Sequence, residues 1–493
     1  MISALSILIL LPLGLLSALF LLVRPTPRSS KAPPASASVS RIPLVGSLDF
    51  FTRRWDFWKE ARARSKTGNF SFTLAQYNVI GLSGTAGREH FFGSNHYSFD
   101  AGYAVLFGQA PNASMLEAAK VPEGEAQTPS HFTKRIVTLM KREKLQSSLN
   151  QMMSDTRTQL DALGKTGITN PFDSIYLLVF QLTVRIVGCR EIAEDPVLLK
   201  RVLGLFGDVE KSSTPATILF PWFPSAAKVK RTLSAGQLYI IFQGIVDARK
   251  KEGRAEDDPL QTLIDEGDSL RQILEFVIGA LFAGQLNSGI NACYLALDSE
   301  WTSKCRAEIS SVASKYASDP TLPLEEQLLE IPIEAWETEF PVLDLCLKDT
   351  IRLHLQGAAL RRNISGRADK LGDEIVDNGA MLAYHLADVH MDPEVYADPD
   401  KWDPSRYLPD RAEDKKVPFG WLGWGVARHP CLGMRFAKIE QNVILAFFLT
   451  KFDYNLCDAK GTKVDALPPL DANAHSACKP STPVYLSYTQ RKQ

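Results

Sequence analysis

The sequence has almost no net charge, because 55 Lys and Arg residues are balanced by 56 Asp and Glu residues. Nucleic-acid-binding proteins carry a marked excess of positive charge, so this balance argues against that class. The chain also has no internal repeat and no linker in its interior. Its 493 residues are 45% hydrophobic, which is ample for a core, and we expect one large domain after a short leader.

Cysteine is scarce and widely spaced. The seven cysteines are an odd number, and no two of them lie close together in the sequence. A disulfide framework uses an even set, and a zinc site of the CxxC type needs closely spaced pairs, so neither is expected. The pattern fits a reducing compartment.

Charge is absent from residues 2–23. At about 1.5 Å per helical residue, this stretch is long enough to cross the roughly 30 Å core of a bilayer. A cleaved signal peptide has a shorter apolar core and a basic segment before it. Here the basic residues follow the stretch, at Arg24, Arg28 and Lys31. Because positive charge favours the cytosolic side, we expect residues 1–24 to be a transmembrane anchor, with the rest of the chain in the cytosol.

The remainder of the chain divides into a linker and a largely helical region. Residues 25–48 are rich in Pro, Ser and Ala and predict a stiff linker. Within residues 49–493, apolar residues recur mainly at helical spacing, for example in 132–160 and 175–187. Strand-like stretches are short and fall at 70–82, 380–386 and 484–488. The pattern predicts a mainly α domain with a small β region.

A second uncharged stretch covers residues 276–297. One interpretation is another membrane helix. However, the stretch contains Gln285, Asn287 and Asn291 together with glycines, and each glycine weakens a helix interior by about 0.5–1 kcal/mol. A long buried helix that passes close to a flat ligand explains these residues better.

The chemistry is concentrated in residues 418–438, PFGWLGWGVARHPCLGMRFAK. Cys431 comes just before a helical pattern that begins at Met434, and the positive end of a helix dipole favours a thiolate. The adjacent Gly433 allows a large planar group to approach the backbone. A lone cysteine is more often an inert buried thiol, but this one is accompanied by a recognisable loop.

That loop resembles the cysteine loop of the cytochrome P450 family, usually written F-x-x-G-x-R-x-C-x-G. The five defined positions of this pattern correspond to residues Trp424, Ala427, His429, Cys431 and Gly433 here, with the cysteine and the last glycine matching. Trp replaces Phe, and His replaces Arg while keeping a donor for a heme propionate. Ala replaces the glycine of a tight turn. The resemblance implies heme as the cofactor and Cys431 as the axial ligand of its iron.

Further family motifs occur in the expected order. The E-x-x-R motif appears with Asp349 and Arg352 three residues apart, so the two side chains can pair on one helix face. In isolation this could be an ordinary surface ion pair. The resemblance implies that Arg406, in a P-x-R-Y segment, completes a buried charged network that supports the heme. It also implies that Arg362 pairs with a heme propionate, a role that its neighbour Arg361 could take instead.

The oxygen-activating helix of the family carries the motif A-G-x-D/E-T. Here Leu286 takes the acid position and Asn287 the alcohol position, while Gln285 and Ser288 match the A-G-Q-H-T-S variant of sterol demethylase-like members. The resemblance implies catalytic roles for Gln285, Asn287 and Ser288, and the Asn287 amide could orient a water. The segment from Asn287 to Ser299 is shorter than in the family by about one helical turn. A real shortening and an error in the gene assignment both remain open.

The resemblance covers nearly the whole chain and is to fungal microsomal members, including those of secondary metabolism. It implies a cytochrome P450 fold, a single heme domain after the transmembrane helix, on the endoplasmic reticulum membrane with the catalytic domain cytosolic. The expected reaction is insertion of one oxygen atom of O₂ into a hydrophobic small molecule, with electrons from NADPH-cytochrome P450 reductase. Two alternatives stay open: a P450-fold dehydratase, isomerase or peroxide-dependent enzyme that does not activate O₂, and a non-catalytic heme-binding protein.

Overall fold

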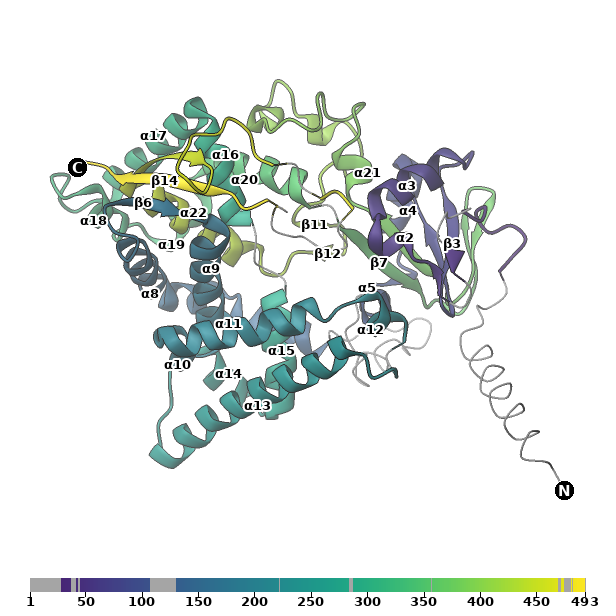
Figure 1. The fold of residues 1–493 in the computed structure, drawn as a ribbon, viewed down its shortest axis with the longest axis horizontal. Coiled ribbons are helices and arrows are strands. Elements are labelled where there is room, and N and C mark those ends of the chain that lie inside the picture. Colours follow the sequence, from purple (N-terminus) through teal and green to yellow (C-terminus); the bar gives the residue numbers. More distant parts are fainter. Residues whose placement is uncertain are drawn as a thin grey trace.

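The structure is a computed structural model that describes residues 28–36, 41–42, 45–106, 130–220, 222–282, 287–355, 357–468, 471–473, 480 and 482–492. The predicted anchor, residues 1–24, lies outside these ranges. Within them, no helix is both long enough and apolar enough to cross a membrane. The described part has a triangular outline, with a sheet at one corner and helices over most of the rest (Figure 1).

A seven-stranded sheet forms the corner nearest the start of the described chain (Figure 1). Its order is β1-β2-β3-β4-β10-β7-β5, with β10 parallel to β4 and antiparallel to β7. The strands are β1 (Arg41–Ile42), β2 (Gly46–Ser47), β3 (Phe70–Leu74), β4 (Tyr77–Gly81), β5 (Tyr97–Ser98), β7 (Ala358–Asn363) and β10 (Met381–His385). Helix α3 (Arg54–Ala63) covers the sheet because its buried Phe57 and Trp58 pack on the ring of Phe70.

Helices dominate the rest of the described chain, as the sequence predicted. They are α2 (Asp49–Thr52), α4 (Gly84–Gly93), α5 (Phe99–Leu106), α7 (His131–Leu139), α8 (Arg142–Asp161), α9 (Pro171–Val187), α10 (Arg190–Glu194), α11 (Pro196–Lys211), α12 (Pro215–Leu219), α13 (Ala226–Glu252), α14 (Pro259–Asp265), α15 (Leu270–Phe282), α16 (Asn287–Leu297), α17 (Ser299–Tyr316), α18 (Leu324–Leu328), α19 (Ile333–Thr338), α20 (Pro341–His354), α21 (Ala387–His390) and α22 (Met434–Lys451). Two 3₁₀ turns, η1 (Pro404–Tyr407) and η2 (Glu413–Lys415), lie between α21 and α22.

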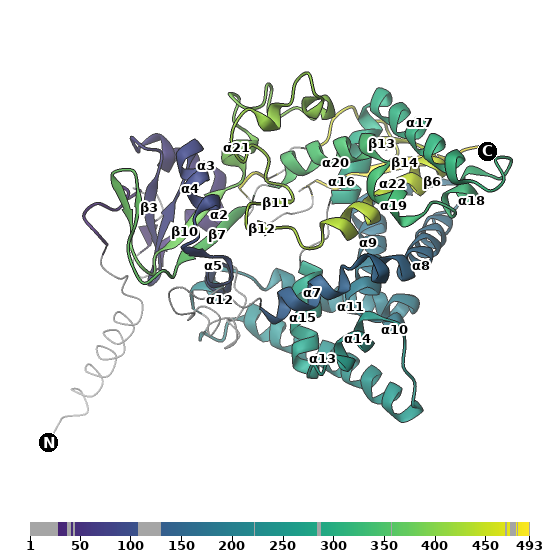
Figure 2. The ribbon, with the colours of Figure 1, turned by 180° about the vertical axis from the view of Figure 1, so that it is seen from behind.

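Three small sheets complete the architecture. They are β13 (Phe452–Cys457) with β14 (Tyr485–Gln490) and β6 (Thr166–Thr169), β8 (Asp369–Leu371) with β9 (Glu374–Val376), and β11 (Gly425–Val426) with β12 (His429–Pro430). The views from front and back agree that β11 and β12 lie between the seven-stranded sheet and the helices α20 and α22 (Figure 2). The hairpin of the cysteine loop is therefore central in the molecule.

The second uncharged stretch forms two buried helices, α15 and α16. Ala292 and Cys293 in α16 are fully buried, and Phe276 and Leu281 in α15 lie in the same hydrophobic core. Gly289 sits close to α9, where a Cβ atom would lie 3.2 Å from the carbonyl oxygen of Pro171. The described parts of this stretch therefore pack inside the protein, as the buried-helix interpretation predicted.

Candidate functional site

The cysteine loop forms a short hairpin. The Cys431 N–H donates to the carbonyl oxygen of Trp424 at 2.7 Å, and Gly425 pairs with Pro430 across the two strands. Gly425 has a φ of 66°, and a Cβ atom there would lie only 2.2 Å from the carbonyl oxygen of His429, so the position requires glycine. Ala427 also has a positive φ, 52°, at the place of the family's turn glycine. The turn therefore forms with an alanine, whose backbone adopts a left-handed conformation that is unfavourable for a residue with a Cβ atom.

Cys431 is the exposed cysteine among those that the structure describes. The others are buried, namely Cys189, Cys293, Cys305, Cys346 and Cys457. Partial desolvation by the surrounding protein raises the pKa of the Cys431 thiol, and a hydrogen bond from the Gly433 backbone N–H lowers it by less. The helix end alone therefore does not produce a thiolate here. A metal ion deprotonates a coordinating thiol outright, so an accessible thiol in this loop suits a metal ligand.

Two adjacent arginines in β7 point in different directions. Arg361 is buried, and its guanidinium lies 4.9 Å from the ring centre of Phe99. Phe99 stacks on His429 of the cysteine loop with a centroid distance of 5.4 Å. Arg362 instead donates from Nε to the carbonyl oxygen of Gly379 at 3.3 Å. Of the two, the structure places Arg361 beside the cysteine loop.

Positive charge is concentrated around Arg361. Burial, with the nearby charge of Arg428, lowers the pKa of Arg361 to about 10. Burial, with Arg361 and Arg428, also lowers the pKa of His429 to about 4, so His429 is neutral at pH 7. Within the described residues no salt bridge joins Arg361 to a carboxylate, and Asp100 acts on it only at longer range. A buried guanidinium without a paired anion is costly, so an anionic group such as a heme propionate fits this position.

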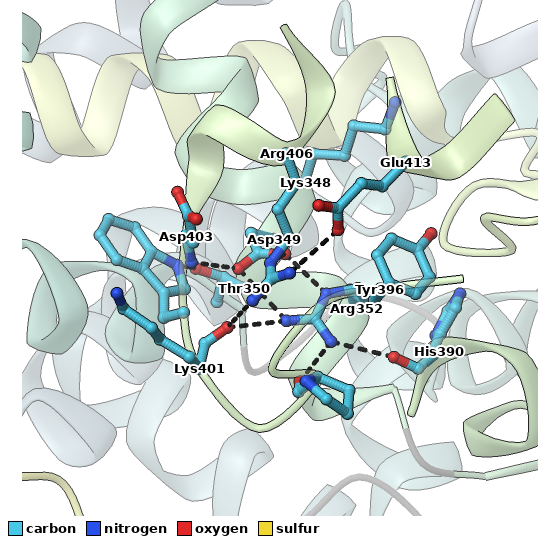
Figure 3. Close-up of polar contacts among 12 residues, drawn as sticks. Lys348, Asp349, Thr350, Arg352, His390, Tyr396, Lys401, Asp403, Arg406 and Glu413 are labelled. Atoms are coloured by element: carbon cyan, nitrogen blue, oxygen red, sulfur yellow. Dashed lines mark hydrogen bonds and ion pairs between the residues drawn. The ribbon is translucent and has the colours of Figure 1, made fainter. Parts of the chain in front are cut away.

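A buried ion pair within α20 holds the segment that follows α21 through hydrogen bonds to its carboxylate. Arg352 Nε lies 2.7 Å from Asp349 Oδ1, and both side chains are fully buried. The second Asp349 oxygen accepts the Asp403 N–H at 2.6 Å, and Tyr407 donates its hydroxyl to Oδ1 at 2.9 Å. The close-up shows Arg352 and Asp403 converging on Asp349 (Figure 3). The Asp349–Arg352 pair, which the spacing of three residues predicted, is therefore a buried contact and not a surface ion pair.

Arg406 belongs to the same network but has a different acid partner. Its Nε is 3.9 Å from Asp349 Oδ1, and this nitrogen has no hydrogen-bond partner among the described residues. Its Nη1 pairs instead with Glu413 Oε2 at 2.9 Å, and Glu413 also binds Arg411 at 2.7 Å. Asp349 is one methylene shorter than the glutamate of the family motif. Glu413 supplies the close carboxylate that this shorter side chain does not, and sequence reasoning missed it.

The guanidinium groups of this network also hold backbone carbonyls. Arg352 donates to the carbonyl oxygens of His390 at 2.9 Å and Lys401 at 3.0 Å. Arg406 donates to those of Asp398 at 2.8 Å and Lys401 at 3.0 Å. Because each charge binds several carbonyls, the network fixes the path of the chain from α21 to η1, which leads to the cysteine loop.

The residues predicted to handle oxygen and protons are not placed in the site. Gln285 lies outside the described residues. Asn287 and Ser288 begin α16, but their side chains are outside the description too, so the roles of all three stay predictions. One turn further on, Asn291 is fully buried and its Oδ1 accepts the Thr350 hydroxyl of α20 at 3.0 Å.

Residues 38–469 match the family described as Cytochrome P450. The chain belongs to the cytochrome P450 family. Among its relatives, cytochrome P450 monooxygenase AacuE of Aspergillus aculeatus is 38% identical over 486 residues, which cover 95% of each chain. Cytochrome P450 monooxygenase nsrP of Aspergillus novofumigatus is 35% identical over 462 residues, covering 91% of this chain and 88% of the relative. Sterol 14-demethylase of Arabidopsis thaliana is 25% identical over 449 residues, covering 88% and 86%.

A solved structure has the same fold as this P450. It is retinoic acid bound cyanobacterial CYP120A1, which is 20% identical, with a TM-score of 0.71 and coverage of 94% of this chain and 100% of the other. The predicted P450 fold, mainly helical with a small β region, is thus confirmed. The prediction of a P450 monooxygenase is confirmed by the family match and by the relatives of that name. The family also implies a heme cofactor, and the surroundings of Cys431 and Arg361 fit one.

Proposed function

We propose that this P450 is a heme-thiolate monooxygenase that inserts one atom of O₂ into a hydrophobic small molecule. The observation that carries the proposal is the accessible Cys431 at the end of a hairpin, beside the buried positive charge of Arg361. A thiolate ligand and a site for anionic propionates are what heme requires from this fold. The monooxygenase names of the fungal relatives support the same reaction.

Each site residue has a defined task in this proposal. Cys431 Sγ binds the iron, Gly433 donates its N–H to that sulfur, and Trp424 holds the Cys431 backbone. His429 and Arg361 would bind the propionates. Arg361 is favoured over Arg362 because it lies beside the cysteine loop, whereas Arg362 binds the carbonyl oxygen of Gly379. When bound, the heme supplies the oxygen chemistry, and its thiolate ligand favours O–O cleavage.

Proton delivery is proposed for the start of α16. Gln285, Asn287 and Ser288 remain our candidates to orient water on the oxygen side of the heme. The Asn287 amide can donate and accept hydrogen bonds, but it does not ionise, so it would orient a water without being the proton source. Leu286 offers no relay. This departure from the family motif keeps a P450 that does not activate O₂ as the second candidate.

The cellular setting is also a proposal. Residues 1–24 would anchor the enzyme in the endoplasmic reticulum membrane, and the heme domain would be cytosolic. The uncharged stretch and the basic residues after it support this arrangement. The predicted linker, residues 25–48, is too long, because β1 (Arg41–Ile42) and β2 (Gly46–Ser47) belong to the seven-stranded sheet and Ala35 bridges Ser71, so the folded domain begins before residue 49. NADPH-cytochrome P450 reductase would supply the electrons. The fungal sources of the relatives support a substrate from secondary metabolism.

Two measurements test the function. Reduced protein treated with CO should show the red-shifted Soret band of thiolate-ligated heme, and Cys431→Ser should lose it. Product analysis should then compare NADPH plus reductase with peroxide alone and with no oxidant, using candidate hydrophobic substrates. Product that depends on NADPH and O₂ supports the proposal. Product formed only with peroxide, or with no oxidant, replaces it with the second candidate, and the absence of the thiolate band overturns it.

A further inference from the structure

A buried histidine joins the charged network to the cysteine loop by hydrogen bonds on both sides. His390, the last residue of α21, is fully buried. Its carbonyl oxygen accepts a hydrogen bond from Arg352 Nη1 at 2.9 Å, while its ring Nε2 accepts the backbone N–H of Leu422 at 3.0 Å. One residue therefore contacts the Asp349–Arg352 pair with its backbone and the cysteine loop with its side chain.

Leu422 lies at the base of the hairpin that carries Cys431. Its carbonyl oxygen accepts the Gly425 N–H at 3.0 Å, and the Trp424 carbonyl oxygen accepts the Cys431 N–H at 2.7 Å. Leu422 is buried, so water does not replace a partner lost from its N–H. A shift of Leu422 would therefore be transmitted through two short hydrogen bonds to the backbone of Cys431.

The ring of His390 is held in the accepting form. Burial, with the nearby charges of Arg352 and Arg88, lowers the pKa of His390 to about 3. The imidazole is thus neutral at physiological pH, and Nε2 carries a lone pair and no proton, because the proton resides on Nδ1. A protonated Nε2 would face the Leu422 N–H donor to donor, and the contact would be lost.

Other side chains fix the loop before this point. Arg88 Nε donates to the Pro418 carbonyl oxygen at 2.9 Å, and the Tyr396 hydroxyl donates to the Gly420 carbonyl oxygen at 2.9 Å. These contacts restrain the entry of the loop. Tyr396 also touches the network, because the Arg352 guanidinium lies 5.0 Å from its ring centre. The His390 contact lies closer to the hairpin and is joined to Arg352 by a hydrogen bond.

We propose that His390 is a positioning residue for Cys431. Its ring accepts the Leu422 N–H and so sets the position of the Cys431 sulfur, while Arg352 holds the backbone carbonyl of His390. The proposal rests on the heme-thiolate function proposed above. It assigns to the charged network a route by which it acts on the iron ligand, through one imidazole acceptor. The heme itself is not contacted by His390.

The test compares two substitutions of similar length at position 390. Gln keeps an acceptor oxygen near the place of Nε2, whereas Met fills a similar volume without a strong acceptor. His385→Met is the matched control. His385 is also fully buried, and its Nδ1 accepts a backbone N–H, that of Ala387 at 3.2 Å, which is outside the cysteine loop.

The readouts are the Soret band of the reduced CO complex and the rate of heme transfer from the ferric holoprotein to a heme-scavenging protein. For His390→Met we expect part of the thiolate band to move to the band of heme without a thiolate ligand, and heme retention to weaken by about tenfold. His390→Gln should restore both readouts toward wild type. His385→Met should leave the band unchanged.

The outcomes separate the two proposals. A wild-type protein without the thiolate band defeats the function proposed above and not only the role of His390. With a normal wild-type band, equal behaviour of the Met and Gln variants overturns the positioning role, whether both are normal or both fail to hold heme. The same band loss in His385→Met also overturns it, because general destabilisation would then be the cause.

Discussion

The close acid partner of Arg406 is Glu413 and not Asp349, and substitutions at these acids give a sharp test of the structure. Arg406 is 1% exposed and Glu413 is 5% exposed at the side chain, with 2.9 Å between Nη1 and Oε2. Glu413→Gln removes the negative charge closest to the Arg406 guanidinium. The remaining partners of Arg406 are then backbone carbonyl oxygens and Asp349, whose Oδ1 lies 3.9 Å from the Arg406 Nε. Breaking a buried pair by removing one partner costs about 3–5 kcal/mol. Because Gln still accepts a hydrogen bond, we expect the lower end, about 3 kcal/mol.

A surface pair provides the matched control. Glu300 pairs with Lys304 at 2.6 Å, but its side chain is 75% exposed. An exposed pair at this spacing is worth about 0.3–0.5 kcal/mol, so Glu300→Gln should change stability by no more than this. The assay is equilibrium urea unfolding of each variant, followed by far-UV circular dichroism and by heme absorbance. The same change at two acids thus isolates the effect of burial.

A second substitution tests the geometric reason. Asp349→Glu adds the methylene that the family motif has and brings a carboxylate closer to Arg406, although overpacking a buried site costs about 1–3 kcal/mol. The loss caused by Glu413→Gln should therefore be smaller in the Asp349→Glu background than in wild type. Equal destabilisation by Glu413→Gln and Glu300→Gln would refute the exchange of partners. Strict additivity in the double variant would refute its explanation by side-chain length.

Three further predictions concern the loop, the sheet and α20. Arg361→Gln should weaken heme retention by about tenfold, as for other residues around a metal group, whereas Arg362→Gln should not; heme transfer measures both. Ala427→Gly should raise the free energy of unfolding by about 0.5–1 kcal/mol in urea titration, because glycine tolerates φ of 52°. Burial raises the pKa of Glu308 to about 7, although its carboxylate accepts the first N–H groups of α20. The folded protein therefore holds a proton that the unfolded chain has lost above about pH 4.5. Stability should fall as pH rises from about 5 to about 7 and then level off, and Glu308→Gln should flatten this part of the urea-derived profile. An unchanged profile in that variant would show that Glu308 does not cause it.

Local spacing determined a large part of the site. Cys431 and Gly433 could be proposed from the sequence as heme-binding residues because the cysteine, its flanking glycine and the start of α22 follow one another along the chain. Asp349 and Arg352 could be paired because residues three apart on any helix share a face. The mainly helical fold followed for the same reason, since apolar periodicity is a property of each segment by itself.

Some assignments could not come from the sequence. Alternation along a strand requires Arg361 and Arg362 to point to opposite faces, but only the packing of β7 against α5 and the cysteine loop decides which of the two lies near Cys431. Glu413 is the first residue of the short 3₁₀ turn η2 and has no distinguishing sequence pattern, and it pairs with Arg406 because the chain folds back from η1 to η2.

The sequence by itself thus determined which residue types and spacings are available to bind a heme, because these depend on residue type and on spacing within one element. Tertiary structure alone decided how they are supported. The hydrogen bond from Leu422 to His390 joins residues far apart in the chain, and its strength depends on burial and on a neutral ring that only the folded surroundings provide. Contacts of this kind carry no local pattern, since they arise from where whole elements pack and not from how neighbouring residues alternate.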